Sequence, residues 1–216
     1  MGRNVFITGA TGYMGQRLVP LLVQRGHSVK ALVRRGSEAK APAEAQIVVA
    51  DPLETDSYTK AISPADTFIH LIGVAHPSPA KAKQFRDIDF VSAQVAIDSA
   101  KEAGIKHFIY LSVAQPAPMM QAYIAVRSEC EQTIRKRGLT ATILRPWYVL
   151  GPGHRWPSAL IPFYWICERL PMTRDGARRL GLVRLEQMVN ALVWSVENPP
   201  AGIRVLGVPE IRASSC

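Results

Sequence analysis

The sequence has few cysteines and none of the patterns that mark disulfide-bonded, zinc-binding or secreted proteins. Cys130, Cys167 and Cys216 are odd in number and far apart, with no Cys-x-x-Cys pair. No charged leader with an apolar core precedes the first apolar run, and the aromatic-rich stretch 156–170 is too short to span a bilayer. We therefore expect a cytoplasmic protein in a reducing compartment.

Acidic residues are fewer than basic ones, and the formal net charge is +9. This excess raises the possibility of a nucleic-acid partner. However, the basic residues are scattered, without a helix-turn-helix pattern or interleaved aromatics, so we do not expect one. The 216 residues, of which 48% are hydrophobic, suffice for one sizeable core, and no repeat or linker interrupts them. A single domain over residues 1–216 is expected.

A glycine-rich segment follows the first apolar run of the chain. Gly9, Gly12 and Gly15 are spaced three apart behind the run 5–7, and apolar residues then recur at helical spacing. A strand that ends in such glycines and becomes a helix presents main-chain N–H groups and the positive end of the helix dipole to a pyrophosphate. The context predicts the first βαβ unit of a dinucleotide-binding fold.

Arg34 and Arg35 follow the second predicted strand, residues 28–33. Folds of this kind that bind NAD commonly place an acidic residue about 20 positions beyond the glycines, where it binds the ribose 2′-hydroxyl. Two guanidinium groups at this point favour the 2′-phosphate of NADP(H) instead, with NAD(H) as the alternative. A solvated basic loop is the other interpretation.

Two more predicted strands have a polar residue in them or directly after them, and the pattern leaves the roles of these residues open. Asp51 follows the strand 46–50 and could accept from the adenine amino group or cap a helix over residues 54–62. His70 lies within the strand 67–72. No second ligand stands at metal-binding spacing, so we expect a packed strand residue rather than a metal ligand.

The glycine motif, Arg34, Asp51, the strands that contain His70 and Ser112, and the segment 144–146 together resemble the short-chain dehydrogenase/reductase superfamily. The likeness is greatest to its extended and atypical branches, which include epimerase/dehydratase-like and NmrA-like proteins. It covers residues 3–153 and continues weakly through 182–198. The resemblance implies a doubly wound Rossmann-type α/β fold, with a mostly parallel sheet, helices on both faces and a small C-terminal segment.

The resemblance also implies the residues that contact the cofactor. These are Gly9, Thr11, Gly12, Tyr13, Met14, Gly15, Arg34, Arg35, Asp51, Leu53, Leu71, Ile72, Gly73, Tyr123, Arg127, Pro146, Tyr148, Val149 and Leu150.

The catalytic residues that the resemblance implies are Tyr123 as general acid/base, Arg127 and Ser112. In the superfamily a lysine lies one helical turn after the tyrosine, holds the nicotinamide ribose and lowers the tyrosine pKa. Arg127 occupies that position here, and its planar guanidinium is not equivalent to an ammonium group. Ser112 occupies the position of the serine that polarises a substrate carbonyl. Asp89 stands where extended members have an asparagine.

Residues 151–181 are expected to form the substrate side of the site or a lid. Within them, the aromatic-rich stretch 156–170 could belong to the core, line an apolar pocket, form a dimer face or lie against a membrane surface. His154 could donate a proton, although a surface histidine is the simpler interpretation. The sequence and the resemblance together predict an NADP(H)-binding oxidoreductase, or an isomerase-like enzyme of the epimerase/dehydratase type, that acts on a small apolar carbonyl compound. The alternative is a non-catalytic, NADP(H)-responsive protein similar to NmrA-like regulators or to the Rossmann-type accessory subunit of respiratory complex I.

Overall fold

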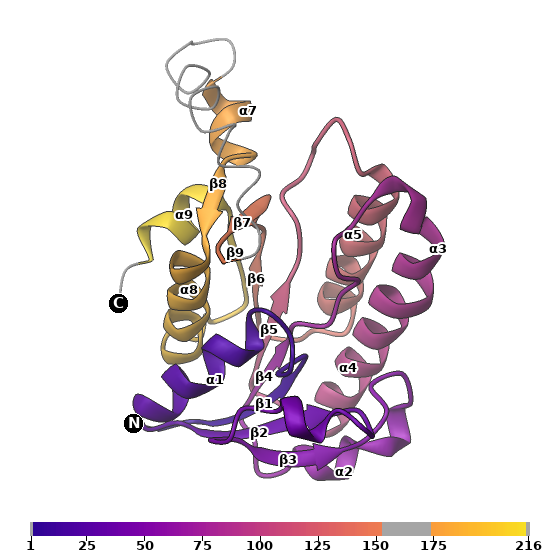
Figure 1. The fold of residues 1–216 in the computed structure, drawn as a ribbon, viewed down its shortest axis with the longest axis vertical. Coiled ribbons are helices and arrows are strands. Elements are labelled where there is room, and N and C mark those ends of the chain that lie inside the picture. The colour runs from indigo at the N-terminus through magenta and orange to yellow at the C-terminus, as the bar shows by residue number, and fades with distance from the viewer. Residues whose placement is uncertain (1, 153–173, 215–216) are drawn as a thin grey trace.

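Seven parallel strands form the central sheet in the computed structural model, which describes residues 2–152 and 174–214 (Figure 1). In sheet order they are β3 (Gln46–Val49), β2 (Ser28–Val33), β1 (Asn4–Thr8), β4 (Thr67–His70), β5 (His107–Leu111), β6 (Ala141–Leu144) and β9 (Ile203–Leu206). The chain runs outward from β1 to β3 and then returns to place β4 on the other side of β1. This order confirms the predicted doubly wound fold and puts its switch point between β1 and β4.

Helices cover both faces of the sheet (Figure 1). On one face lie α1 (Gly15–Gln24), α8 (Leu185–Glu197) and α9 (Val208–Ala213). On the other lie α2 (Thr59–Ile62), a π-helix (Phe85–Phe90) that continues into α4 (Val91–Glu102), and α5 (Gln121–Lys136). Shorter elements are the 3₁₀ turns Glu38–Lys40, Thr55–Ser57 and Pro79–Lys81, and the helices α3 (Ala82–Gln84) and α7 (Arg174–Arg179).

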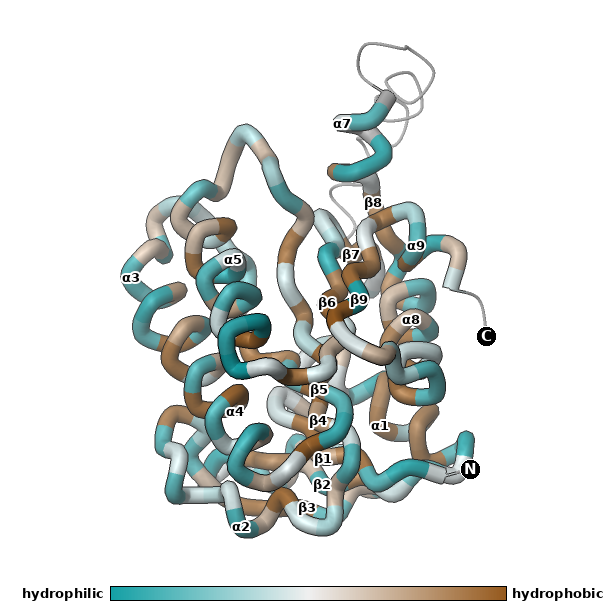
Figure 2. The backbone as a smooth tube through the Cα atoms, turned by 180° about the vertical axis from the view of Figure 1, so that it is seen from behind, coloured by the Kyte–Doolittle hydropathy of each residue, from teal (hydrophilic) through white to brown (hydrophobic). Residues whose placement is uncertain are grey.

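The alternation of side chains along β1 shows how the sheet divides the core. Val5 and Ile7 pack under α1 and α8, whereas Phe6 points to the opposite face and packs with the residues under α4 and α5. Every residue of β4 is buried, as predicted for a parallel strand covered on both sides. Figure 2 shows hydrophobic residues along the central strands, while α7 is largely hydrophilic.

Several elements differ from the sequence-based expectation. The helix expected over residues 54–62 is split into a 3₁₀ turn and α2. The long helix that ends at Glu102 begins as a π-helix, which no sequence pattern indicated. A second, two-stranded parallel sheet joins β7 (Tyr148–Leu150) to β8 (Leu182–Arg184), and it was not expected. Within residues 2–152 and 174–214, no helix is long and apolar enough to cross a membrane.

Candidate functional site

The glycine-rich loop lies at the switch point and touches the backbone that leaves β4. Gly9 has a φ of +82°, and a Cβ added there would lie 2.9 Å from the carbonyl carbon of Leu71. A Cβ added at Gly15 would lie 2.5 Å from both the Ala10 Cα and the Gly9 carbonyl oxygen. The Gly12 N–H donates to the Gly9 oxygen at 3.1 Å, which closes the turn before α1 begins. The chain therefore needs glycines here for close backbone packing, as a dinucleotide cradle does.

Other predicted cofactor residues lie within this loop or against it. Thr11, Tyr13 and Met14 are half-buried, whereas Gly12 is exposed. A Cβ added at Gly151, directly after β7, would fall on the Tyr13 hydroxyl. The end of the segment 148–150 therefore reaches the glycine-rich loop. The Pro146 carbonyl oxygen accepts from the Ala114 N–H at 2.8 Å, which fixes the start of this segment against the loop that follows β5.

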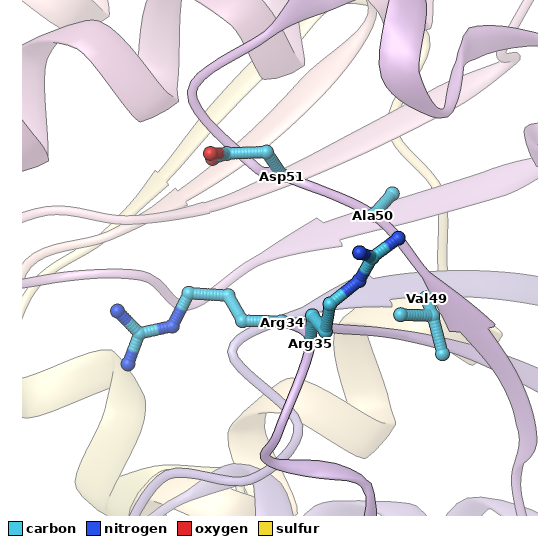
Figure 3. Close-up of a pocket in the computed structure, with 5 residues that line it drawn as sticks. All are labelled: Arg34, Arg35, Val49, Ala50 and Asp51. Carbon is cyan, nitrogen blue, oxygen red and sulfur yellow. The ribbon is translucent and has the colours of Figure 1, made fainter.

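Arg34 and Arg35 line a pocket of about 360 Å³ with Val49, Ala50 and Asp51, at the ends of β2 and β3. Both arginines are exposed, and neither guanidinium group has a hydrogen-bond or ion-pair partner among the residues that the structure describes. Figure 3 shows that the two guanidinium groups point to opposite sides. The pocket thus offers two available cations, and both would contact one phosphate only after a side chain rotates.

Asp51 forms a local turn rather than a helix cap. Its Oδ1 accepts from the Leu53 N–H at 2.9 Å, and its carbonyl oxygen accepts from the Ser57 hydroxyl at 2.6 Å. The side chain stays exposed beside the arginine pocket. Both Asp51 and Leu53 remain accessible to a ligand at this end of the sheet.

Arg127 is 2% exposed and lies in a dense set of contacts beneath the β4 exit. Its Nη2 donates to Asp89 Oδ1 at 2.6 Å and to the Ile72 carbonyl oxygen at 3.4 Å. Its Nη1 donates to the Leu111 carbonyl oxygen at 2.9 Å and to the Tyr110 hydroxyl at 3.3 Å. Nε is buried and has no hydrogen-bond partner among the described residues. The terminal donors are therefore committed within the protein, which the sequence did not suggest.

Asp89 and His70 flank this guanidinium. Asp89 is fully buried; burial raises the pKa of its carboxyl, and Arg127 opposes this. His70 Nδ1 lies 2.9 Å from the Thr8 hydroxyl. Burial, followed by the nearby charge of Arg127, lowers the His70 pKa to about 3. His70 is thus the packed, neutral strand residue that the sequence predicted.

Ser112 is also committed to a buried network. Its hydroxyl donates to Glu131 Oε1 at 2.6 Å. The same carboxylate binds Arg145 through Nε at 3.0 Å and Nη2 at 2.5 Å, and Gln115 donates to it at 3.0 Å. An ionised carboxylate only accepts, so the single Ser112 hydrogen points toward Glu131. In this arrangement Ser112 offers a further ligand only acceptor lone pairs.

Tyr123 lies on α5, the helix that also carries Arg127 and Glu131, and its surroundings are largely apolar. Its ring packs on Phe85 with centroids 4.9 Å apart, and the Arg127 guanidinium lies 5.1 Å from the ring centroid. Val113, the residue after Ser112, belongs with Ile124 to a small cluster against which Tyr123 packs. Ala117 also belongs to that cluster, and the partly buried Trp147 and Leu180 pack against it. The neighbourhood of Tyr123 therefore suits an apolar group.

Sequence reasoning missed Glu131 and the pairing of Asp89 with Arg127. A signal for the first was present, because Tyr123, Arg127 and Glu131 are spaced four apart and so share one face of α5. The second joins residues 38 positions apart. His154, Cys167, Cys216, the stretch 156–170 and most of the expected lid lie outside the described residues.

Comparisons with known proteins identify relatives of this chain. The profile of a family described as NAD(P)H-binding matches residues 9–153. A ceramide reductase of Caulobacter vibrioides is 27% identical over 92% of this chain. The chain spans 62% of the length of that reductase. An uncharacterized sugar epimerase of Bacillus subtilis is 32% identical, over 66% of this chain and 71% of its own.

Solved structures show the same fold. The UDP-glucuronic acid 4-epimerase of Bacillus cereus, in complex with NAD, superposes with a TM-score of 0.68 at 17% identity. The match covers 94% of this chain and 77% of the epimerase.

Proposed function

Because the chain belongs to the NAD(P)H-binding family within the short-chain dehydrogenase/reductase superfamily, we propose that it is a reductase that uses NADP(H) and acts on a small, apolar carbonyl compound. The observation that carries the cofactor choice is the pair of exposed arginines at the ends of β2 and β3, whose guanidinium groups have no partner within the described part of the chain. A 2′-phosphate there would gain charge-assisted hydrogen bonds from the guanidinium groups, against repulsion from the Asp51 carboxylate, which lines the same pocket.

The glycine-rich loop would hold the pyrophosphate. There is no room for a Cβ at Gly9 or Gly15, and glycine has none, so the main chain of this loop is left open to a ligand. Thr11, Tyr13 and Met14 belong to the same loop. The backbone of Leu71, Ile72 and Gly73 would form the neighbouring wall of the cradle. The segment that contains Pro146, Tyr148, Val149 and Leu150 would cover the nicotinamide end.

Tyr123 would act as the general acid. When bound, NADPH supplies the hydride that adds to the carbonyl carbon. Tyr123 donates its hydroxyl proton to the carbonyl oxygen and regains a proton from solvent, which gives an alcohol and NADP⁺. Arg127, 5.1 Å from the ring, places a positive charge beside the developing phenolate. The cluster of Val113, Ile124, Trp147 and Leu180 would select an apolar substrate.

Ser112 contributes to this site as an acceptor. With its hydrogen donated to Glu131, it can receive a hydrogen bond from a substrate hydroxyl next to the reacting carbon. Polarising a carbonyl oxygen would require the hydrogen to leave Glu131. This role therefore depends on a rearrangement of the network when substrate binds.

A non-catalytic, nucleotide-responsive protein is the second candidate. It is favoured by the commitment of Arg127 and Ser112 to buried partners, which leaves Tyr123 without the two donors that usually assist it. A fold that keeps the cradle does not by itself guarantee the reaction.

Hydride transfer by the full chain separates the two candidates. The protein is loaded with NADPH and mixed with a panel of apolar ketones, aldehydes and quinones, and the loss of the reduced cofactor is followed optically. For a reductase, Tyr123→Phe should lower the rate by about 100-fold or more. The control is Tyr58→Phe, which removes only the hydroxyl of a buried ring that stacks on Phe6, away from the site. It should leave the rate unchanged. NADPH binding without turnover across the panel would support the second candidate.

A further inference from the structure

The backbone that leaves β4 forms one wall of the proposed cofactor cradle. The Leu71 N–H donates to the Thr8 carbonyl oxygen at 3.0 Å, and a Cβ at Gly9 would also lie 3.1 Å from the Ile72 nitrogen. Leu71 and Ile72 therefore lie directly against the glycine-rich loop, and Gly73 and Val74 continue the same backbone. Any displacement of these residues would change the shape of the cradle.

Asp89 and Arg127 hold this wall on both sides of Gly73. Arg127 Nη2 donates to the Ile72 oxygen, and the Val74 N–H donates to Asp89 Oδ2 at 3.0 Å. A Cβ added at Gly73 would collide with Arg127 Nη2 and lie 3.3 Å from Asp89 Oδ1. The ion pair thus fills the space directly beneath Gly73.

The pair is costly to separate. Both side chains are almost fully buried, and they come from the π-helix and from α5, on the face opposite α1. Removal of one charge would leave the other in a low-dielectric interior without its partner. The backbone at Ile72 and Val74 would lose its anchors in the same step.

We propose that Asp89 is a positioning residue for cofactor binding, which acts through Arg127 to fix the backbone of Ile72 and Val74 against the glycine-rich loop. In this role Arg127 supports the wall of the site from below and does not bind the nicotinamide ribose. The proposal rests on the proposed binding of NADP(H). It adds Asp89 to the residues on which that binding depends.

The test compares Asp89→Asn with Glu131→Gln. Glu131 also forms a buried ion pair from α5, one turn after Arg127, but its partners are Arg145, Ser112 and Gln115. Both variants should lower the melting temperature. Only Asp89→Asn should weaken NADPH binding, measured by fluorescence titration, by about tenfold or more, which corresponds to about 1.4 kcal/mol. Equal affinities of the two variants would overturn the proposal.

Two further variants separate positioning from a direct contact or a loss of folding. Arg127→Lys keeps the charge but cannot reach Asp89, Ile72 and Leu111 together, so it should also weaken NADPH binding; tight binding by this variant would show that charge at the ribose is what matters. Gly73→Ala keeps both charges and pushes the pair away, and it should weaken binding even if Asp89→Asn does not fold.

Hydrogen exchange should show faster exchange at the Val74 amide in Asp89→Asn and not in Glu131→Gln. If the wild-type chain binds neither NADPH nor NADH, the proposed function fails before this question arises.

Discussion

Gly15→Ala should damage the cradle through backbone contacts alone. The added Cβ would lie 2.5 Å from the Ala10 Cα and the Gly9 oxygen, and 2.6 Å from the Ala10 oxygen. All three are main-chain atoms, so no flexible side chain can move aside and α1 itself must shift from β1. Overpacking of this kind costs about 3 kcal/mol at the upper end of its usual range. Alanine recovers about 1 kcal/mol because it favours the helix.

The net loss of about 2 kcal/mol predicts a fall in melting temperature of roughly 4–8 °C for a chain of this size. Binding of NADPH should weaken by about tenfold or more, because the N–H groups of the turn lose their alignment. Calorimetry and a fluorescence titration measure the two effects. Gly202→Ala is the matched control, since nothing lies within 4 Å of its added Cβ. If Gly15→Ala melts and binds as Gly202→Ala does, the close-packing argument for the cradle is wrong.

Two other predictions concern buried polar groups. Burial is the main reason that the pKa values of His70 and His107 fall to about 3 and about 4, so both are neutral in the folded chain at pH 5. The unfolded chain binds these protons below its ordinary pKa near 6.5; stability should therefore fall by about 1.4 kcal/mol per pH unit for each histidine as the pH drops from 6.5 to 4. Denaturant unfolding of His70→Gln should show roughly half of this histidine contribution, and a slope equal to that of the wild type would contradict the assignment. Glu131→Gln should cost about 2 kcal/mol because Arg145, whose side chain is 26% exposed, loses its charged hydrogen-bond partner; an unchanged denaturation midpoint would contradict this expectation.

The local pattern was sufficient to predict the glycine-rich start of the fold and its second strand. The predicted strand 28–33 matches β2, because apolar periodicity and a preceding glycine are local signals. The sheet of β7 and β8 was missed because each strand has three residues and its partner lies beyond residues 153–173. The cytoplasmic location stays a prediction.

The site was predictable where it depends on backbone and not where it depends on pairing. The glycines, the arginine pair and the packed His70 follow from residue type and position. The orientation of Ser112 does not, because Ser112 lies one residue beyond β5 and its hydrogen bond is to Glu131, on a helix 19 positions further along the chain. The structure turns Ser112 toward Glu131 and packs Val113 in the cluster beside Tyr123.

Side-by-side titration of the chain with NADPH and NADH tests the central claim most directly. One charge-assisted contact to the 2′-phosphate is worth about 1.5–3 kcal/mol, so NADPH should bind roughly 10- to 150-fold more tightly than NADH. Arg34→Ala should remove most of this difference without changing the affinity for NADH, and Arg35→Ala measures the share of the second guanidinium, which points to the other side. Equal affinities for the two cofactors in the wild-type chain, or a preference for NADPH that survives the loss of both arginines, would contradict the account.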